Sequence, residues 1–225
     1  LNIVSKIVSR VRKEGDNALA DFTREFDNYD LVKKGFFFKE HEIKKVESLI
    51  STDDKIALNL AIERITNYHK NQKPTDFSWK DEIGVELGWH WKPVERVGVY
   101  VPGGKASYPS SAIMNIVPAR IAGVNDIIMC CPTQHGNFNP LVLYVAHALG
   151  VKKIFKIGGA QAIAGIALGT KIIEKVDKIV GPGNAYVSEA KRQLVGEVGI
   201  DSLAGPSEVV IICDSSMNPR LAAID

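Results

Sequence analysis

Four glycine-rich segments contain the residues of this sequence that are best suited to bind a ligand. They lie at residues 100–105, 158–161, 181–184 and 204–207. Glycine lets backbone amides come close to a bound group, and a helix that starts behind such a loop offers N–H groups and a positive dipole to phosphate. Gly and Pro also form ordinary tight turns, and for any single loop both explanations stay open. Four loops of this type together favour a ligand site.

The standard nucleotide-binding signatures do not fit these loops. A Walker loop would need Gly where Val99 stands and Ser or Thr where Ala106 stands. The dinucleotide fingerprint would need Gly where Tyr186 stands. Nucleotide binding therefore cannot be inferred from either pattern.

Metal-binding and nucleophile patterns fail as well. His41 begins a metalloprotease-like pair, but Lys45 occupies the place of the second histidine. Cys130 and Cys131 lie in an apolar run and are interpreted as core thiols, and Ser207 lacks the glycine that follows a nucleophile elbow. The histidines share no ligand spacing, which favours structural or surface roles; they are His41, His69, His90, His135 and His147.

The overall composition is that of an ordinary globular protein. The 225 residues are 45% hydrophobic and 24% charged, which excludes disorder, collagen and coiled coil. A formal net charge of +2 gives no general attraction to nucleic acid or to an anionic membrane, and no apolar run approaches the ~18 residues of a membrane span. We expect no nucleic-acid partner and no membrane association. Three cysteines, two of them adjacent, indicate a reducing, cytoplasmic location.

The first 96 residues are predicted to be mainly helical and to act as a scaffold. Helices are expected over 3–11 and 18–26, and a third begins at Ser51, which resembles a capping box with Asp54. The apolar face expected for the third helix consists of Ile56, Leu60, Ile65 and Tyr68. A polar connection is expected over 71–83 and a strand over 85–91.

From about residue 96, strands and helices alternate. The strands are expected over 97–101, 126–131, 153–157, 177–180 and 208–213, and the helices over 111–122, 140–149, 159–168 and 184–195. Strands this rich in Ile and Val suit a parallel sheet that is covered on both faces. The pattern predicts an α/β fold with a Rossmann-like, doubly wound, mostly parallel sheet, and ligands bind such sheets at the carboxyl ends of the strands.

The loop motifs resemble those of the histidinol dehydrogenase family. The matching segments are 98–104 (GVYVPGG), 158–164 (GGAQAIA), 175–184 (KVDKIVGPGN) and 200–209 (IDSLAGPSEV). Four long motifs in the right order are specific, and 15–19 (GDNAL) looks like the family's early helix. The resemblance covers nearly the whole chain but only roughly the front half of the family's chain. Because the sequence begins at Leu1 and ends at Asp225 within an expected helix, we expect a fragment.

The resemblance implies an enzyme that oxidises L-histidinol to L-histidine through the aldehyde. Two hydrides pass to two NAD molecules in this last step of histidine biosynthesis, and the family enzyme is a zinc-dependent homodimer. Carried over by position, Tyr100, Gln161 and Asn184 contact NAD and Ser207 contacts the substrate. Asn184 could equally cap the helix that follows it.

The family's catalytic and metal-binding groups fall outside this sequence. Its zinc ligands and its Glu–His acid/base pair lie beyond the equivalent of Asp225, so we expect neither catalytic nor metal-ligating residues here and an inactive fragment. The resemblance also divides the chain into the helix-rich start of a larger domain (1–96), a Rossmann-like NAD-contacting domain (97–207) and a return strand with a helix start (208–225). The alternative is a stand-alone nucleotide-binding module without redox activity. A purely structural interaction protein would not explain the four loops.

Overall fold

The computed structural model describes residues 2–103, 108–203, 208 and 210–224. Its helices are α1 (Asn2–Glu14), α2 (Asp16–Asp27), α3 (Leu31–Lys34), α4 (Glu40–Glu47), α5 (Thr52–Lys70), α6 (Pro109–Ala122), α7 (Pro140–Ala148), α8 (Gly159–Leu168), α9 (Ala185–Leu194) and α10 (Pro219–Ile224), with a 3-10 turn at Gln134–Gly136. Its strands are β1 (Phe77–Lys80), β2 (Glu86–Trp89), β3 (Arg96–Tyr100), β4 (Asp126–Cys130), β5 (Lys153–Phe155), β6 (Lys178–Val180) and β7 (Gly199–Ile200).

A parallel sheet forms the centre of the described chain. Its five strands lie in the order β5-β4-β3-β6-β7, and each neighbouring pair is parallel. The chain therefore starts in the middle of the sheet, runs outward to β5, and then returns to the other side of β3. This is the Rossmann strand order, and its reversal point between β3 and β6 is where such sheets bind ligands. The predicted α/β parallel sheet is confirmed.

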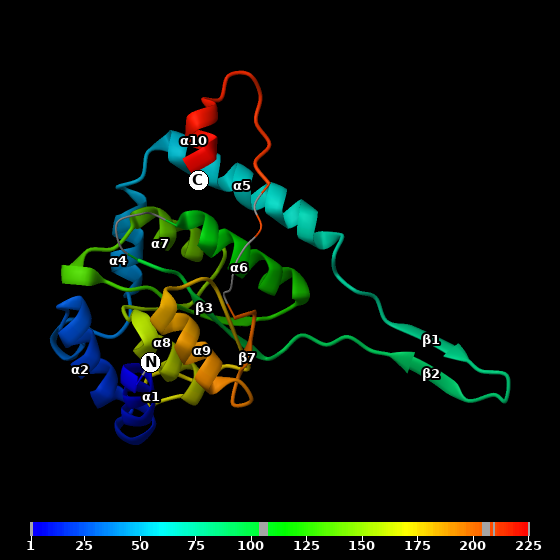
Figure 1. Cartoon of the computed structure of the whole chain (residues 1–225), viewed down its shortest axis with the longest axis horizontal. Coiled ribbons are helices and arrows are strands. Elements are labelled where there is room, and N and C mark those ends of the chain that lie inside the picture. The colour runs from blue at the N-terminus through cyan, green and yellow to red at the C-terminus, as the bar shows by residue number, and fades with distance from the viewer. Residues whose placement is uncertain (1, 104–107, 204–207, 209, 225) are drawn as a thin grey trace.

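Helices cover both faces of the sheet (Figure 1). On β3, Val97 and Val99 face the core that contains α4, α6 and α7, whereas Tyr100 faces the core that contains α1, α2, α8 and α9. The side chains of β4 alternate in the same way, with Met129 on the first side and Ile128 on the second. Near-continuous apolar strands thus arise because both faces are buried.

The N-terminal helices share these cores with the sheet. Val4 and Val11 of α1 and Leu19 of α2 are buried in the same cluster as Ile163 of α8, and Ile43 of α4 is buried in the cluster on the opposite face. Residues on both sides of position 96 therefore build each core. The division of the chain into two domains remains a prediction.

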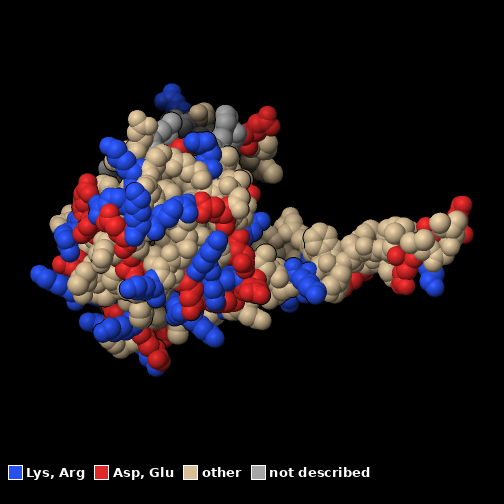
Figure 2. Space-filling model, turned by 90° about the horizontal axis from the view of Figure 1, so that it is seen from below, with Lys and Arg blue, Asp and Glu red and all other residues tan. Residues whose placement is uncertain are grey.

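A two-stranded hairpin extends away from the rest of the described chain. Strands β1 and β2 pair antiparallel, with Phe77 opposite Trp89 and Trp79 opposite Leu87. Figures 1 and 2 show the hairpin as an arm, and Figure 2 shows positive and negative side chains intermixed over the visible face of the body. The strand expected near 85–91 is confirmed, but the expected polar connection over 71–83 was wrong in part, because it contains β1.

Helix α5 begins as predicted but presents a different face to the core. Ser51 Oγ accepts a hydrogen bond from the Asp54 amide at 3.1 Å, which confirms the predicted cap. Of the four residues expected on its apolar face, Ile56, Leu60 and Tyr68 are exposed. The side chains that pack against the core of α6 and α7 are Leu58, Ala61, Ile62 and Ile65. The error arose because α5 is apolar on more than one side, so its periodicity alone does not select the buried face.

The strand expected over 208–213 is absent from the part of this segment that the structure describes, residues 208 and 210–213. Val210 and Ile212 are 87% and 95% exposed. β-branched side chains favour a strand only where a neighbouring strand offers hydrogen bonds and packing, and 210–213 pairs with none of the described strands. Among the described residues, no helix is both long enough and apolar enough to cross a lipid bilayer.

Candidate functional site

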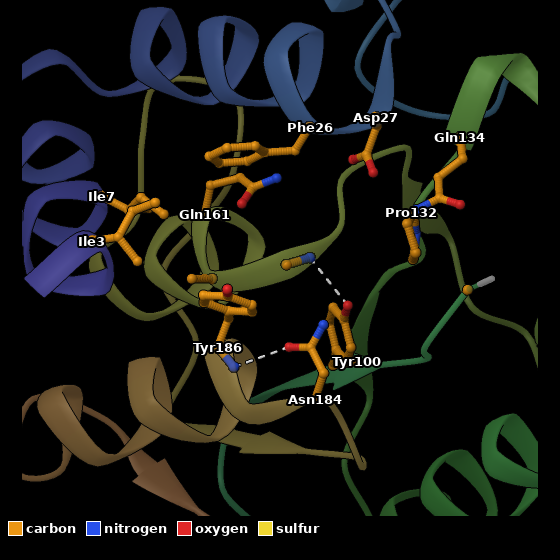
Figure 3. Close-up of a pocket in the computed structure, with 13 residues that line it drawn as sticks. Ile3, Ile7, Phe26, Asp27, Tyr100, Pro132, Gln134, Gln161, Asn184 and Tyr186 are labelled. Atoms are coloured by element: carbon orange, nitrogen blue, oxygen red, sulfur yellow. Dashed lines mark hydrogen bonds between the residues drawn. The ribbon is translucent and has the colours of Figure 1, made fainter. Parts of the chain in front are cut away.

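A pocket of about 320 Å³ lies where the sequence predicted a ligand site, at the carboxyl end of β3 and the first residues of α8 and α9. One part of its wall is apolar or aromatic and consists of Ile3, Ile7, Phe26 and Tyr186. The polar part consists of Asp27, Gln134, Gln161 and Asn184 (Figure 3). Tyr100 also lines the pocket, with both an aromatic ring and a hydroxyl. The volume is at the lower end of the range for small-molecule sites.

Tyr100 lines this pocket but is almost completely buried. Its ring belongs to the core beneath α8, and its hydroxyl oxygen accepts a hydrogen bond from the Gly159 amide at 3.1 Å (Figure 3). Burial raises the pKa of the Tyr100 hydroxyl, so the group stays protonated at neutral pH. The side chain therefore fixes the first residue of α8 and keeps a proton that can be donated toward the pocket.

Gln161 and Asn184 both lie at the starts of helices. Gln161 is 1% exposed and lies in the first turn of α8. Asn184 is the N-cap of α9, and its Oδ1 accepts hydrogen bonds from the amides of Tyr186 and Val187, each at 3.1 Å. The capping role considered for Asn184 is thus confirmed. Its Nδ2 donor is not used by the cap.

The structure brings Tyr100, Gln161 and Asn184 into one pocket, although they are separated by up to 84 positions in the chain. Ser207, the predicted substrate contact, lies outside the described residues, and so does the end of the first glycine-rich loop at 104–105. The three predicted cofactor contacts remain predictions, but their positions are compatible with a single ligand.

Two glycines of these loops are required by close packing. At Gly181, φ is +118° and a Cβ would lie 2.0 Å from the Tyr100 carbonyl oxygen. At Gly158, a Cβ would lie 2.4 Å from the Cβ of Pro132. These glycines allow neighbouring strand ends to approach each other, so the tight-turn explanation of the loops applies alongside the ligand explanation.

A buried lysine and an aspartate hold the loop after β6. The Gly181 amide donates to Asp201 Oδ2 at 2.8 Å, and the Gly181 carbonyl accepts from Lys191 Nζ at 2.5 Å. Lys191 Nζ also contacts Asp201 Oδ1 at 2.8 Å, and its side chain is only 5% exposed. We call these three residues the Gly181 clamp. The clamp fixes the loop that leads to Asn184.

Asp27 is the feature of the pocket that sequence reasoning missed. It is 6% exposed, and among the described residues no hydrogen bond partner is found for its buried Oδ2. Burial raises the pKa of the Asp27 carboxyl, and the Gln134 side chain and the Gly158 amide only partly oppose that effect. Its signal in the sequence is an acidic residue in the last turn of a helix, where the helix dipole disfavours negative charge.

The raised pKa of Asp27 predicts a pH-dependent cost to stability. A carboxyl that binds its proton more tightly in the folded chain contributes stability below its unfolded pKa, about 3.9, and loses it as pH rises through the folded value. Asp27→Asn should therefore stabilise the chain at pH 7 relative to wild type but have little effect at pH 3.5. The titratable groups coupled electrostatically to Asp27 are Tyr100, Cys131 and His135.

Urea unfolding of both chains between pH 3.5 and 7, followed by far-ultraviolet circular dichroism, measures this difference. The other carboxyl groups are common to both chains, so their contributions cancel. A difference in the free energy of unfolding that does not change with pH would contradict the assignment.

The described residues contain no group of three or more His, Cys, Asp or Glu side chains that could hold a metal ion. The interpretation of Cys130 and Cys131 as core thiols is confirmed, because both are buried. Burial raises the pKa of the Cys131 thiol to about 12. With no such group of ligands, the described residues do not form a zinc site.

A family model, curated relatives and a solved structure all relate this chain to the same family. A family model described as histidinol dehydrogenase matches residues 1–225. Histidinol dehydrogenases from Brucella abortus and Cereibacter sphaeroides are 52% and 48% identical over 99% of this chain, which covers 52% and 51% of their lengths. The crystal structure of histidinol dehydrogenase from Elizabethkingia anophelis superposes with a TM-score of 0.90 at 38% identity, over 99% of this chain and 52% of that one. The chain thus spans about half the length of the relatives it matches.

Proposed function

This chain belongs to the histidinol dehydrogenase family, and on that premise we propose that it forms the NAD-binding part of an enzyme that oxidises L-histidinol to L-histidine. The observation that carries the proposal is the convergence of Tyr100, Gln161 and Asn184 in one pocket at the reversal point of the sheet. These side chains come from the carboxyl end of β3 and from the starts of α8 and α9, which is the edge of the sheet where a Rossmann-like fold binds its ligands.

The two sides of the pocket suit the two kinds of group in NAD. Phe26 and Tyr186 present aromatic surface at which a base can bind, next to the apolar side chains of Ile3 and Ile7. The starts of α8 and α9 supply the positive ends of two helix dipoles for the pyrophosphate, beside the free Nδ2 donor of Asn184. Bound NAD would accept the hydride that leaves the substrate. The residues of this chain bind and orient it.

We further propose that proton transfer and the zinc chemistry implied by the resemblance belong to groups outside this chain. No cluster of side chains in the described residues fits the metal. Ser207 is proposed as the substrate contact, residues 97–207 as the inserted NAD-contacting domain, and the assembled enzyme as a homodimer in the cytoplasm. The buried thiols of Cys130 and Cys131 are compatible with that reducing compartment.

Calorimetric titration with NAD tests the proposed site. Gln161→Ala, Asn184→Ala and Tyr100→Phe should each weaken binding by about 5- to 30-fold, the equivalent of about 1–2 kcal/mol for a hydrogen bond lost in a partly solvated pocket. Asn184→Ala should also lower the free energy of unfolding by about 1 kcal/mol, because α9 loses its N-cap.

The matched control is Asn17→Ala, since Asn17 is exposed on α2 and does not line the pocket. It should bind NAD as the wild type does. If the wild type and all three pocket variants show equal affinity, the cofactor site has been placed wrongly.

A further inference from the structure

We propose that Asp27 binds the adenosine ribose of NAD through its carboxylate and makes the pocket select NAD over NADP. This inference rests on the proposed function and adds a specificity-determining residue to it. Asp27 is the last residue of α2, and Figure 3 shows its carboxylate directed into the pocket, in the same cavity as Gln161 and Tyr100.

The state of this carboxylate indicates that a ligand completes it. The side chain is more than nine-tenths buried, yet its Oδ2 finds no partner among the residues that the structure describes. A buried polar atom without a hydrogen bond is costly, and the negative end of the α2 dipole increases that cost. An O–H or N–H donor on a bound molecule would remove it.

The neighbouring residues identify the donor as a ribose. An ionised carboxylate only accepts hydrogen bonds, and either of the vicinal hydroxyls of a ribose can donate to the unpaired Oδ2. The other polar side chains of the lining are the amides of Gln134, Gln161 and Asn184 and the phenols of Tyr100 and Tyr186. Among the described residues of the lining, Asp27 is the one acidic side chain, so the site suits a neutral diol better than a metal cation.

Its place in the pocket wall indicates which ribose. Asp27 and Phe26 both line the pocket from the last turn of α2 (Figure 3), and Phe26 belongs to the apolar wall with Ile3 and Ile7. A base that packs on this wall places its own sugar beside the carboxylate. Adenine takes no part in hydride transfer and suits such an apolar slot, whereas the nicotinamide must reach the substrate.

The same geometry excludes a phosphorylated ribose. NADP carries a phosphate on the 2′-oxygen of its adenosine ribose, so it lacks one donor and brings a negative charge toward Asp27. Repulsion between two like charges is strong where water is largely excluded, and acidic residues select against the 2′-phosphate in other dinucleotide sites.

Calorimetry with NAD and NADP on this chain tests the inference. Wild type should prefer NAD, and Asp27→Asn should weaken NAD binding by about 10- to 100-fold, the usual range for a lost hydrogen bond to a charged group. NADP affinity should stay equal or rise, so the preference for NAD falls by at least the same factor. The control is Glu25→Gln, which removes one negative charge from an exposed position on the same helix and should change neither affinity.

Stability separates a binding role from a structural one. Because Asp27 is costly to the ligand-free fold, Asp27→Asn should leave the thermal midpoint equal or higher, whereas loss of a structural contact would lower it. If wild type binds NAD and Asp27→Asn binds it equally well, or if the variant weakens NAD and NADP by the same factor, this inference is overturned and the proposed function stands. A wild-type chain that binds no NAD contradicts both.

Discussion

Gly181→Ala should lower the free energy of unfolding by about 4 kcal/mol and remove measurable NAD binding, since backbone strain costs about 1–3 kcal/mol and overpacking a similar amount. A Cβ at this position would lie 2.0 Å from the Tyr100 carbonyl oxygen, and the φ of +118° is unfavourable for any side chain. The obstacle is the backbone of the central strand β3, so it cannot rotate away. The loop would have to move, and Asn184 would move with it.

Gly196→Ala is a matched control for this prediction. Gly196 also has a positive φ, +95°, but nothing lies within 4 Å of its Cβ position. It should lose only the strain contribution, about 1–2 kcal/mol, and bind NAD normally. Urea unfolding gives both values. Equal losses for the two variants would show that contact with Tyr100 does not determine the cost.

Lys191→Met should produce the second largest effect, a loss of about 3 kcal/mol in the free energy of unfolding. Methionine preserves the volume and apolar character of the stem, but the Gly181 carbonyl loses its donor and Asp201 loses its cationic partner. Asp201 is 31% exposed, so water reaches it and the loss stays at the lower end of the range for broken buried pairs. Because the clamp holds the loop before Asn184, NAD binding should weaken as well.

Two further variants separate the clamp from general effects of charge. Lys171→Met removes the same charge from an exposed lysine and should change stability by less than about 0.5 kcal/mol. Lys191→Met combined with Asp201→Asn should cost less than the sum of the single changes, because both disrupt one network. Strict additivity would show that the two residues act independently.

The alternation of strands and helices after residue 96 was predictable because it depends on local pattern. Apolar runs between Gly and Pro turns determine where β3, β4, α7 and α8 begin and end, and each lies close to its expected range. The local sequence pattern failed where strand formation depends on a neighbouring strand. Strand β1 forms because β2 lies beside it, and residues 210–213 remain without a strand although their composition favours one.

The candidate site also has features that the local sequence predicts and features that it does not. Its glycine-rich loops and the positions of Gln161 and Asn184 follow from local turn chemistry and from the resemblance. Asp27 and the clamp between Lys191 and Asp201 depend on packing between distant segments: α2 against α8, and α9 beside the end of β7. No local pattern encodes those contacts, so only the folded chain reveals them.

The projecting hairpin is the source of the intrinsic tryptophan fluorescence of this chain. All three tryptophans of the chain, Trp79, Trp89 and Trp91, lie on this arm or next to it, and they are 41%, 52% and 57% exposed. The rings of Trp79 and Trp89 are 5.9 Å apart, close enough for their excited states to couple. Intrinsic fluorescence will therefore report the arm and whatever contacts it, while the parallel sheet can unfold with little change in emission.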